Sequence, residues 1–317
     1  MTREEIIQKV SSHLSTDVVE AEMIIDKAII GGETTEEELE SWLNNRFLPN
    51  VVFIDEDGYA RMCIDALKIV GTTAASDYGS SRQRDLGQLW ADMTRGYIGE
   101  LAFKIFLKQN EIDIELGHEA GELSEYLPND IHKVKKDKEE FREPKIKVGI
   151  KATKWNGIWF DIPGDQFNHS DFHVLVKVGT GRDHLFAYFK KISVFKDKVL
   201  KVGQDIGLLS GDEANTLYNN LPTFKPISAY IAGFVKKDEK YDDLPYKGKS
   251  GRLNYKITEW NGQIKPGDLE IIKDKEKVKG KIAFEGIGSF AHDSGYLFNT
   301  GNLKWGKKDW KEVMEGL

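Results

Sequence analysis

Three residues in the middle of the chain are of types that can carry chemistry together: Glu100, Asp130 and Lys151. Glu100 lies inside the helix-like run GYIGELAFKIFL, Asp130 ends the motif PND, and Lys151 lies in the alternating run IKVGIKATK. Carboxylates are ligands that Mg²⁺ prefers, and a lysine can stabilise negative charge that develops during a reaction. The combination is therefore a candidate for metal-assisted hydrolysis.

The order of these motifs resembles the PD-(D/E)XK nuclease superfamily, and most closely its type II restriction endonucleases. The core of that family has a helix bearing a Glu and a strand that ends near a metal-binding Asp. A second strand follows, with an acidic residue two places before a Lys. The similarity covers residues 96–177 of the 317.

The resemblance implies roles for individual residues in a Mg²⁺-dependent active site. Asp130 would be the central metal ligand, and Glu100 and Ile150 would complete the metal site. Lys151 lies on the strand face opposite Ile150, where it would polarise the attacking water or stabilise the phosphorane. We therefore expect Asp130, Lys151 and Glu100 to be the catalytic residues.

One position departs from the family pattern. The acidic residue expected two places before Lys151 is Gly149 in this chain. Some family members move this carboxylate to the neighbouring helix, which makes Glu100 the natural substitute. Glu140 and Glu143 are weaker candidates, and Gly149 could simply let a backbone carbonyl face the metal.

Each of these residues also has a purely structural interpretation. Asp130 could be an ordinary turn former after Pro-Asn. Glu100 could pair on the helix surface with Lys104. Lys151 could be a solvated strand lysine, in which case Lys147 or Lys154 could be the functional one.

Other residue types that often carry chemistry do not form sites here. His169 and His173 would not share a helical face, as a zinc-binding pair requires, because His173 opens a predicted strand. Cys63 lies in an apolar helical run and is expected to fill the core. The chain has no G-x-x-x-x-G-K-[ST] motif, so nothing indicates ATP hydrolysis.

The segment after the Lys151 strand could reach a DNA groove. Asn and Gln can read adenine edges, and Arg or Lys can read guanine or grip phosphates. The predicted DNA contacts in this segment are Lys154, Trp155 and Asn156, with Gln166 further along it. Arg82 and Arg84, which precede the long helix-like run, are predicted as further DNA contacts. Alternatively, the tryptophans pack in the core and the amides cap turns.

Hydropathy patterns place these motifs on helices and strands. Helical spacing over the first 46 residues, with Thr35 as a helix cap, precedes the apolar run NVVFI and a helix over 60–70. The stripe of LGQLWADMTRGYIGELAFKIFLKQ predicts a long helix. The predicted strands are IKVGIKAT, FHVLVKV, LFAYFKKISVF, ISAYIAGFV and KIAFEGI, and KKDWKEVMEGL predicts a terminal helix.

Charge is distributed unevenly along the chain. The net charge is −7, but residues 1–57 hold 14 acidic and 4 basic side chains. Residues 131–154 hold nine Lys/Arg and four Asp/Glu. Because local charge governs binding to a phosphate backbone, we expect residues 131–154, including Lys133, Lys135 and Lys136, to contact DNA, and the acidic segment to lie away from it.

Composition sets further limits. Apolar residues make up 40% of the chain and charged residues 31%, as in a folded globular protein. Neither a run of about 18 apolar residues nor a signal-peptide core is present, and the single cysteine cannot form an internal disulfide. We therefore expect a cytoplasmic protein without a membrane partner.

Together these observations predict an α/β (mixed α+β) fold. A restriction-endonuclease-like core of a mixed central sheet flanked by helices would occupy residues 59–200. An acidic helical N-terminal subdomain (1–58) would precede it, and a β-rich C-terminal region (201–317) would serve DNA recognition or dimerisation.

The predicted function is Mg²⁺-dependent, site-specific cleavage of double-stranded DNA at a short palindromic site by a homodimer, with a possible companion DNA methyltransferase. The alternatives are a repair or recombination nuclease with the same core and a non-catalytic DNA-binding protein, which Gly149 keeps open. An unrelated metabolic protein is disfavoured because no organic-cofactor fingerprint is present.

Overall fold

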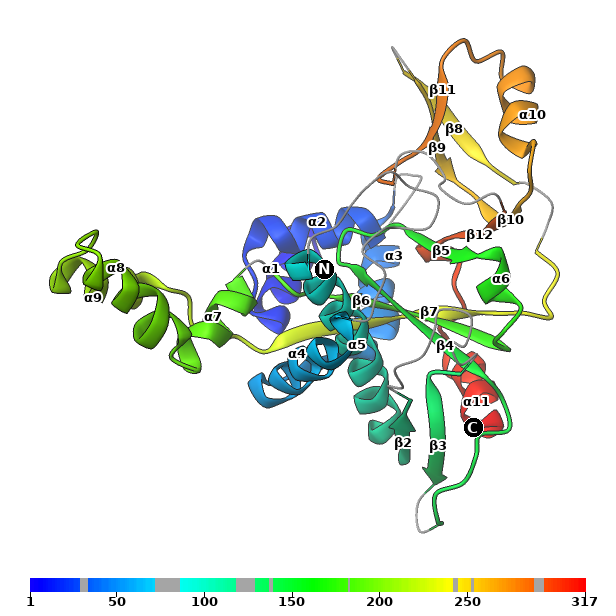
Figure 1. Cartoon of the computed structure of the whole chain (residues 1–317). Coiled ribbons are helices and arrows are strands. Elements are labelled where there is room, and N and C mark those ends of the chain that lie inside the picture. Colours follow the sequence, from blue (N-terminus) through cyan, green and yellow to red (C-terminus); the bar gives the residue numbers. More distant parts are fainter. Residues whose placement is uncertain are drawn as a thin grey trace.

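The chain adopts a mixed α/β fold in which helices flank a central sheet and smaller sheets extend from it (Figure 1). The computed structural model describes residues 1–28, 34–71, 86–117, 129–136, 139–181, 183–241, 245–251, 254–287 and 294–317. Within these ranges, no helix is both long enough and apolar enough to cross a membrane.

The central sheet has the strand order β1-β7-β6-β4. Its strands are β1 (Val51–Ile54), β7 (Ile227–Lys236), β6 (Phe172–Val178) and β4 (Val148–Lys154). β6 runs parallel to β4 and antiparallel to β7, which runs antiparallel to β1. β4, β6 and β7 were predicted as strands, whereas β1 was noted only as an apolar run; β1 and β7 join the sheet from outside residues 59–200.

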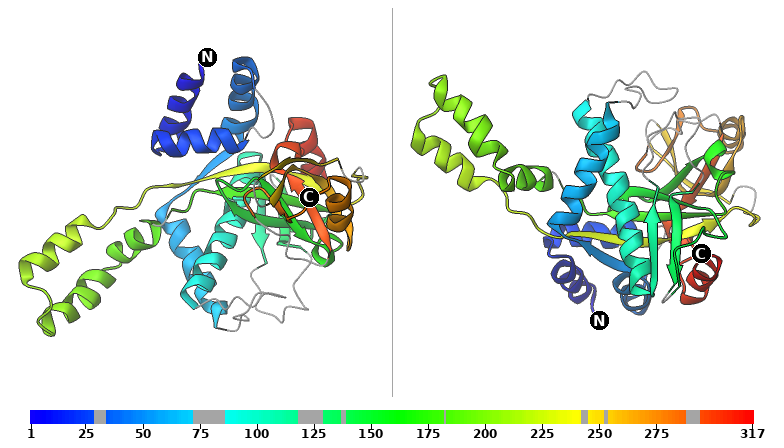
Figure 2. Two further views of the ribbon diagram at one scale, coloured as in Figure 1. Left: turned by 90° about the horizontal axis from the view of Figure 1, so that it is seen from above. Right: turned by 60° about the horizontal axis from the view of Figure 1, so that its bottom comes forward.

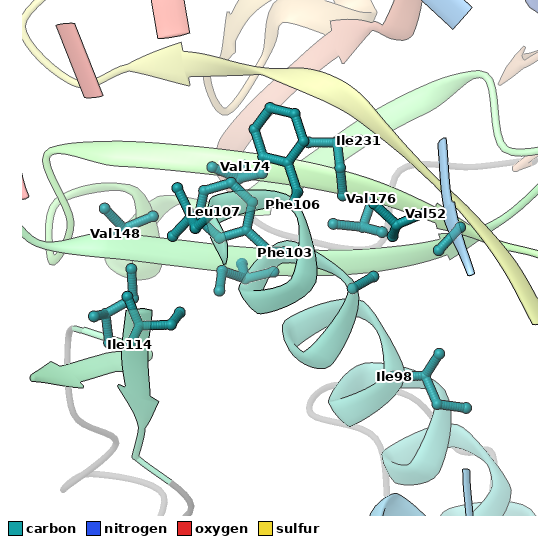
Figure 3. Packing of buried hydrophobic residues seen from close by; sticks show 14 of the residues in the cluster. Val52, Ile98, Phe103, Phe106, Leu107, Ile114, Val148, Val174, Val176 and Ile231 are labelled. Atoms are coloured by element: carbon teal, nitrogen blue, oxygen red, sulfur yellow. The ribbon is translucent and has the colours of Figure 1, made fainter. Parts of the chain in front are cut away.

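One face of the sheet is covered by three helices, α4 (Glu56–Val70), α5 (Leu86–Gln109) and α11 (Lys307–Gly316). Figure 3 shows the apolar side chains of α5 against those of the sheet. Val148 and Ile150 of β4 belong to this core, whereas Lys151 does not. The predicted alternation of β4 is therefore confirmed, because neighbouring residues of a strand face opposite sides.

The N-terminal helices cover the other face of the sheet. They are α1 (Arg3–Leu14), α2 (Val18–Ala28), α3 (Glu36–Ser41), the π-helical η1 (Trp42–Phe47) and the short η2 (Leu48–Asn50). Their apolar side chains share a core with Leu175 of β6 and with Tyr230, Ala232 and Val235 of β7. Thr35 caps α3 and exchanges hydrogen bonds with Glu38, as its sequence predicted.

Smaller sheets complete the body. β2 (Ile112–Leu116) and β3 (Ile131–Lys136) form an antiparallel pair between α5 and β4. The strands β5 (Trp159–Pro163), β12 (Gly295–Asn299) and β10 (Asn261–Ile264) form a second sheet, with α6 (Gly164–Phe167) and η5 (Thr300–Asn302) beside it. The third sheet contains β8 (Lys247–Ser250), β9 (Asn254–Glu259) and β11 (Lys281–Phe284), and α10 (Asp268–Lys275) accompanies it.

A helical arm projects from the body between β6 and β7 (Figures 1 and 2). It comprises α7 (Asp183–Lys191), the π-helical η4 (Phe195–Leu200), α8 (Lys201–Asp205) and α9 (Gly211–Asn220). The prediction of a strand over LFAYFKKISVF was wrong, because most of that run is α7. The same apolar residues fit a helical stripe, and the helix buries that stripe against α4 and α5.

Candidate active site

Asp130 lies at the free edge of β4, held by hydrogen bonds to the strand backbone. Its N–H donates to the Val148 carbonyl (3.0 Å), and its carboxylate accepts the Ile150 N–H. The Asn129 side-chain oxygen accepts the N–H groups of Val148 (3.0 Å) and Ile131 (3.1 Å). Hydrogen bonds of Asn129 and Asp130 thus fix the Asp130 carboxylate against this edge.

The backbone of Ile150 faces the same edge. In a strand, the N–H and C=O of one residue point to the same side. Because the Ile150 N–H donates to Asp130, the Ile150 carbonyl also points toward the Asp130 side. The Ile150 side chain is buried in the core, so only its carbonyl is a candidate metal ligand.

The Lys151 side chain lies on the face of β4 opposite to that of Ile150, where it is half-buried. Its ammonium donates a hydrogen bond to the Gln166 side-chain oxygen (2.5 Å). Burial lowers the pKa of Lys151, while the carboxylates of Asp130, Asp161 and Glu100 act in the opposite direction. These three carboxylates therefore lie within electrostatic reach of the Lys151 ammonium. Glu100 and Asp130, two of the residues singled out in the sequence, are thus both in the electrostatic surroundings of Lys151.

Glu100 reaches the site because α5 lies very close to β4. A Cβ atom at Gly99 would come within 2.7 Å of the Ala152 Cβ, so only glycine permits this approach. The adjacent Glu100 is half-buried as a result. Lys104, considered as a helix-surface partner of Glu100, forms an ion pair with Asp113 (3.8 Å).

Two residues near Lys151 received no site role in the sequence prediction. Asp161 is the single acidic residue of β5, where Trp159, Phe160 and Ile162 are buried. Such an isolated acid in an apolar strand is a usable sequence signal. Gln166 was considered only as a DNA contact, and nothing in its spacing indicated the hydrogen bond to Lys151.

Gly149 faces His173 across the β4–β6 pair. A Cβ atom at 149 would lie 3.1 Å from His173 Nδ1, so the imidazole stands beside the position of the missing acid. Nε2 lies 3.0 Å from the Phe167 carbonyl, which can only accept, so Nε2 carries the proton. Burial lowers the pKa of His173 to about 4, the Phe167 hydrogen bond opposes this shift, and Lys151 adds to it.

The other candidates from the sequence lie away from this arrangement. Glu140 and Glu143 are exposed in the segment before β4. His169 is exposed whereas His173 is buried, and the strand position of His173 agrees with the expectation that the two do not form a zinc pair. Cys63 is buried in the core, as expected.

The predicted DNA contacts differ in their surroundings. Lys154 and Asn156 are exposed at the end of β4 and just beyond it. Trp155 is 6% exposed, and its ring packs against Phe47 and Tyr230. Its role as a DNA contact is therefore wrong, since the indole belongs to the core. Arg82 and Arg84 lie outside the described residues.

The donor set suits Mg²⁺, which commonly binds one or two carboxylates and completes its shell with water and substrate oxygen atoms. Asp130, Glu100 and the Ile150 carbonyl are donors of this kind. In the described part of the chain, no three His, Cys, Asp or Glu side chains form a metal-holding group. A cation here would therefore take several ligands from backbone, water or substrate.

Comparisons of the chain with family models, with curated proteins and with solved structures found no match. The geometry of this site and the order of its elements are therefore the observations that bear on the function of the chain.

Proposed function

We propose that the protein is a Mg²⁺-dependent endonuclease of the PD-(D/E)XK type that cleaves double-stranded DNA at specific sites. The observation that carries this proposal is the hydrogen-bonded placement of Asp130 against the edge of β4, the strand that bears Lys151, with Glu100 and Asp161 within electrostatic reach of that lysine. An aspartate fixed at a strand edge and a lysine on that strand are the groups that phosphodiester hydrolysis needs.

The order of elements supports the same proposal. Along the chain, the Glu100 helix α5 is followed by the β2–β3 pair and then by β4 with Lys151. Asp130 directly precedes β3, and its backbone bonds bring it beside β4. This is the sequence of parts that the family resemblance implies for residues 96–177.

The side chains divide the work of hydrolysis. Asp130, Glu100 and the Ile150 carbonyl would hold Mg²⁺, which supplies an activated water and neutralises phosphate charge when bound. Lys151 places its ammonium where negative charge develops on the phosphorane. The Gln166 side-chain oxygen accepts a hydrogen bond from that ammonium and so orients it. The substrate is a short palindromic site, which a homodimer would cut on both strands; a companion methyltransferase would protect host sites.

Plasmid cleavage with and without Mg²⁺ tests the proposal. Discrete metal-dependent fragments are expected for the wild type, and Asp130→Asn should lower the rate by several orders of magnitude. Its binding to a cleavable site should persist or tighten, because repulsion between carboxylate and phosphate is removed. Asp113→Asn is the matched control, since this β2 carboxylate pairs with Lys104 on the helix surface.

Two further variants separate the roles. Lys151→Ala should abolish cleavage without the gain in binding, because it removes positive charge. Glu100→Gln should cause a large loss of rate if the helix replaces the acid missing at Gly149. Unchanged cleavage by Asp130→Asn would refute the site, an intact plasmid would favour a non-catalytic DNA-binding protein, and a smear would favour a nuclease without sequence preference.

A further inference from the structure

The outer part of the helical arm (residues 195–220) has almost no core of its own. The structure describes every residue from 195 to 220, and Ala214 is the one buried residue among them. Two hydrogen bonds join α7 to the C-terminal end of α9. Lys190 of α7 donates to the Leu221 carbonyl (2.7 Å), and the Tyr218 hydroxyl donates to the Lys190 carbonyl (3.2 Å). The arm thus projects from the body (Figure 2), and most of its side chains are exposed.

Large apolar side chains lie exposed along this outer arm. Val199, Val202 and Ile206 are 53%, 56% and 64% exposed, and Leu208 near the tip is 73% exposed. Val199 lies in η4, Val202 in α8 and Ile206 directly after α8, and their spacing of three and four residues is that of one helical stripe. A contiguous apolar stripe on a soluble surface marks an interaction site more often than a solvated face.

The charges of the outer arm are divided along its length. Residues 195–201 carry three lysines and one aspartate, whereas residues 202–213 carry three carboxylates and no lysine or arginine. A second arm lying antiparallel would set the basic part of each against the acidic tip of the other. This self-complementary pattern is what a two-fold interface requires. DNA fits less well, because the acidic tip would repel phosphates.

We propose that the outer arm is a dimerisation element that pairs antiparallel with the same arm of a second copy of this chain. The stripe of Val199, Val202 and Ile206 forms the apolar centre of the contact. The oppositely charged segments on either side fix the direction of pairing. This pairing does not depend on nuclease chemistry, so it stands or falls separately from the proposed function.

Sedimentation equilibrium of the full chain tests the proposal. The wild type is expected to sediment as two chains, and Val202→Glu as one, because it introduces a charge into the centre of the contact. Val202 is exposed in the monomer, so its replacement leaves folding intact, which circular dichroism would verify. Ile271→Glu is the matched control, since Ile271 is 59% exposed on α10, and this variant should remain dimeric.

A mixing experiment tests the direction of pairing. Lys198→Glu with Lys201→Glu makes one arm predominantly acidic, with Lys196 as its remaining lysine, and Asp205→Lys with Asp212→Lys makes another predominantly basic. Each double variant should be monomeric alone, and an equimolar mixture should form a heterodimer. Three results would overturn the proposal: a monomeric wild type, a Val202→Glu variant that stays dimeric, or a mixture that stays monomeric. A Val202→Glu variant that stays dimeric but loses DNA binding would instead assign the outer arm to DNA.

Discussion

Replacement of the buried Lys177 tests how much the burial of one charged side chain lowers the free energy of unfolding. It lies on β6 with 3% exposure, and its ammonium donates to the Thr300 hydroxyl (3.2 Å). The buried Arg46 guanidinium nearby donates to the Thr300 (2.8 Å), Gly301 (2.9 Å) and Ala232 (3.1 Å) carbonyls. Burial lowers the pKa of Lys177 to about 7, and repulsion by Arg46 adds to this effect.

Replacing Lys177 with methionine keeps the length of the side chain and removes its charge. Each pKa unit corresponds to about 1.4 kcal/mol, so a fall from 10.5 to about 7 corresponds to about 5 kcal/mol as an upper bound. Below pH 7, lysine is charged in both states and the folded state carries this whole cost. Between pH 7 and 10.5 the unfolded chain binds more protons, so wild-type stability rises with pH.

Urea unfolding of both proteins, followed by tryptophan fluorescence from pH 6 to pH 10, measures the difference. Lys177→Met should be the more stable protein at pH 6, and its advantage should shrink steadily above pH 7. Lys154→Met is the control, because that lysine is exposed on β4 and carries no cost of burial. A constant difference for Lys177→Met, or a less stable variant at pH 6, would refute the reasoning.

Three further predictions concern the site and its surroundings. Gly99→Ala should destabilise the protein by about 1–3 kcal/mol in urea unfolding and slow plasmid cleavage, because its Cβ would push α5 and Glu100 away from β4. Trp155→Ala should lower the unfolding free energy by about 3–5 kcal/mol, while fluorescence anisotropy shows unchanged DNA affinity. Replacing the three lysines of β3 with glutamine should reduce the slope of log affinity against log salt by up to about 3 in the same anisotropy assay; an unchanged slope would place the phosphate contacts elsewhere.

Local patterns in the sequence were sufficient for three of the four strands of the central sheet. Alternation in β4 separated Lys151 from Val148 and Ile150, and the capping pattern fixed the start of α3 at Thr35. The strand predicted over 185–195 failed, because a short apolar run fits either period and its neighbours in space decide the outcome.

What the sequence could not give is contact between distant segments. β7 lies between β1 and β6, although many residues separate it from β1 along the chain. The proximity of Asp161 to Lys151 depends on how β5 turns back after β4. The placement of His173 beside Gly149 depends on the β4–β6 register, which no local pattern specifies.

The helical arm also has a consequence for how the chain can vary. It leaves the sheet after Val178 and returns before Ala229, and these two residues are register partners. The Gly179 N–H donates to the Ser228 carbonyl (2.8 Å), so the excursion is closed at its base like an enlarged hairpin loop. Insertions or deletions in the outer arm can therefore accumulate without altering strand register, which lets the arm diverge independently of the sheet that carries Lys151.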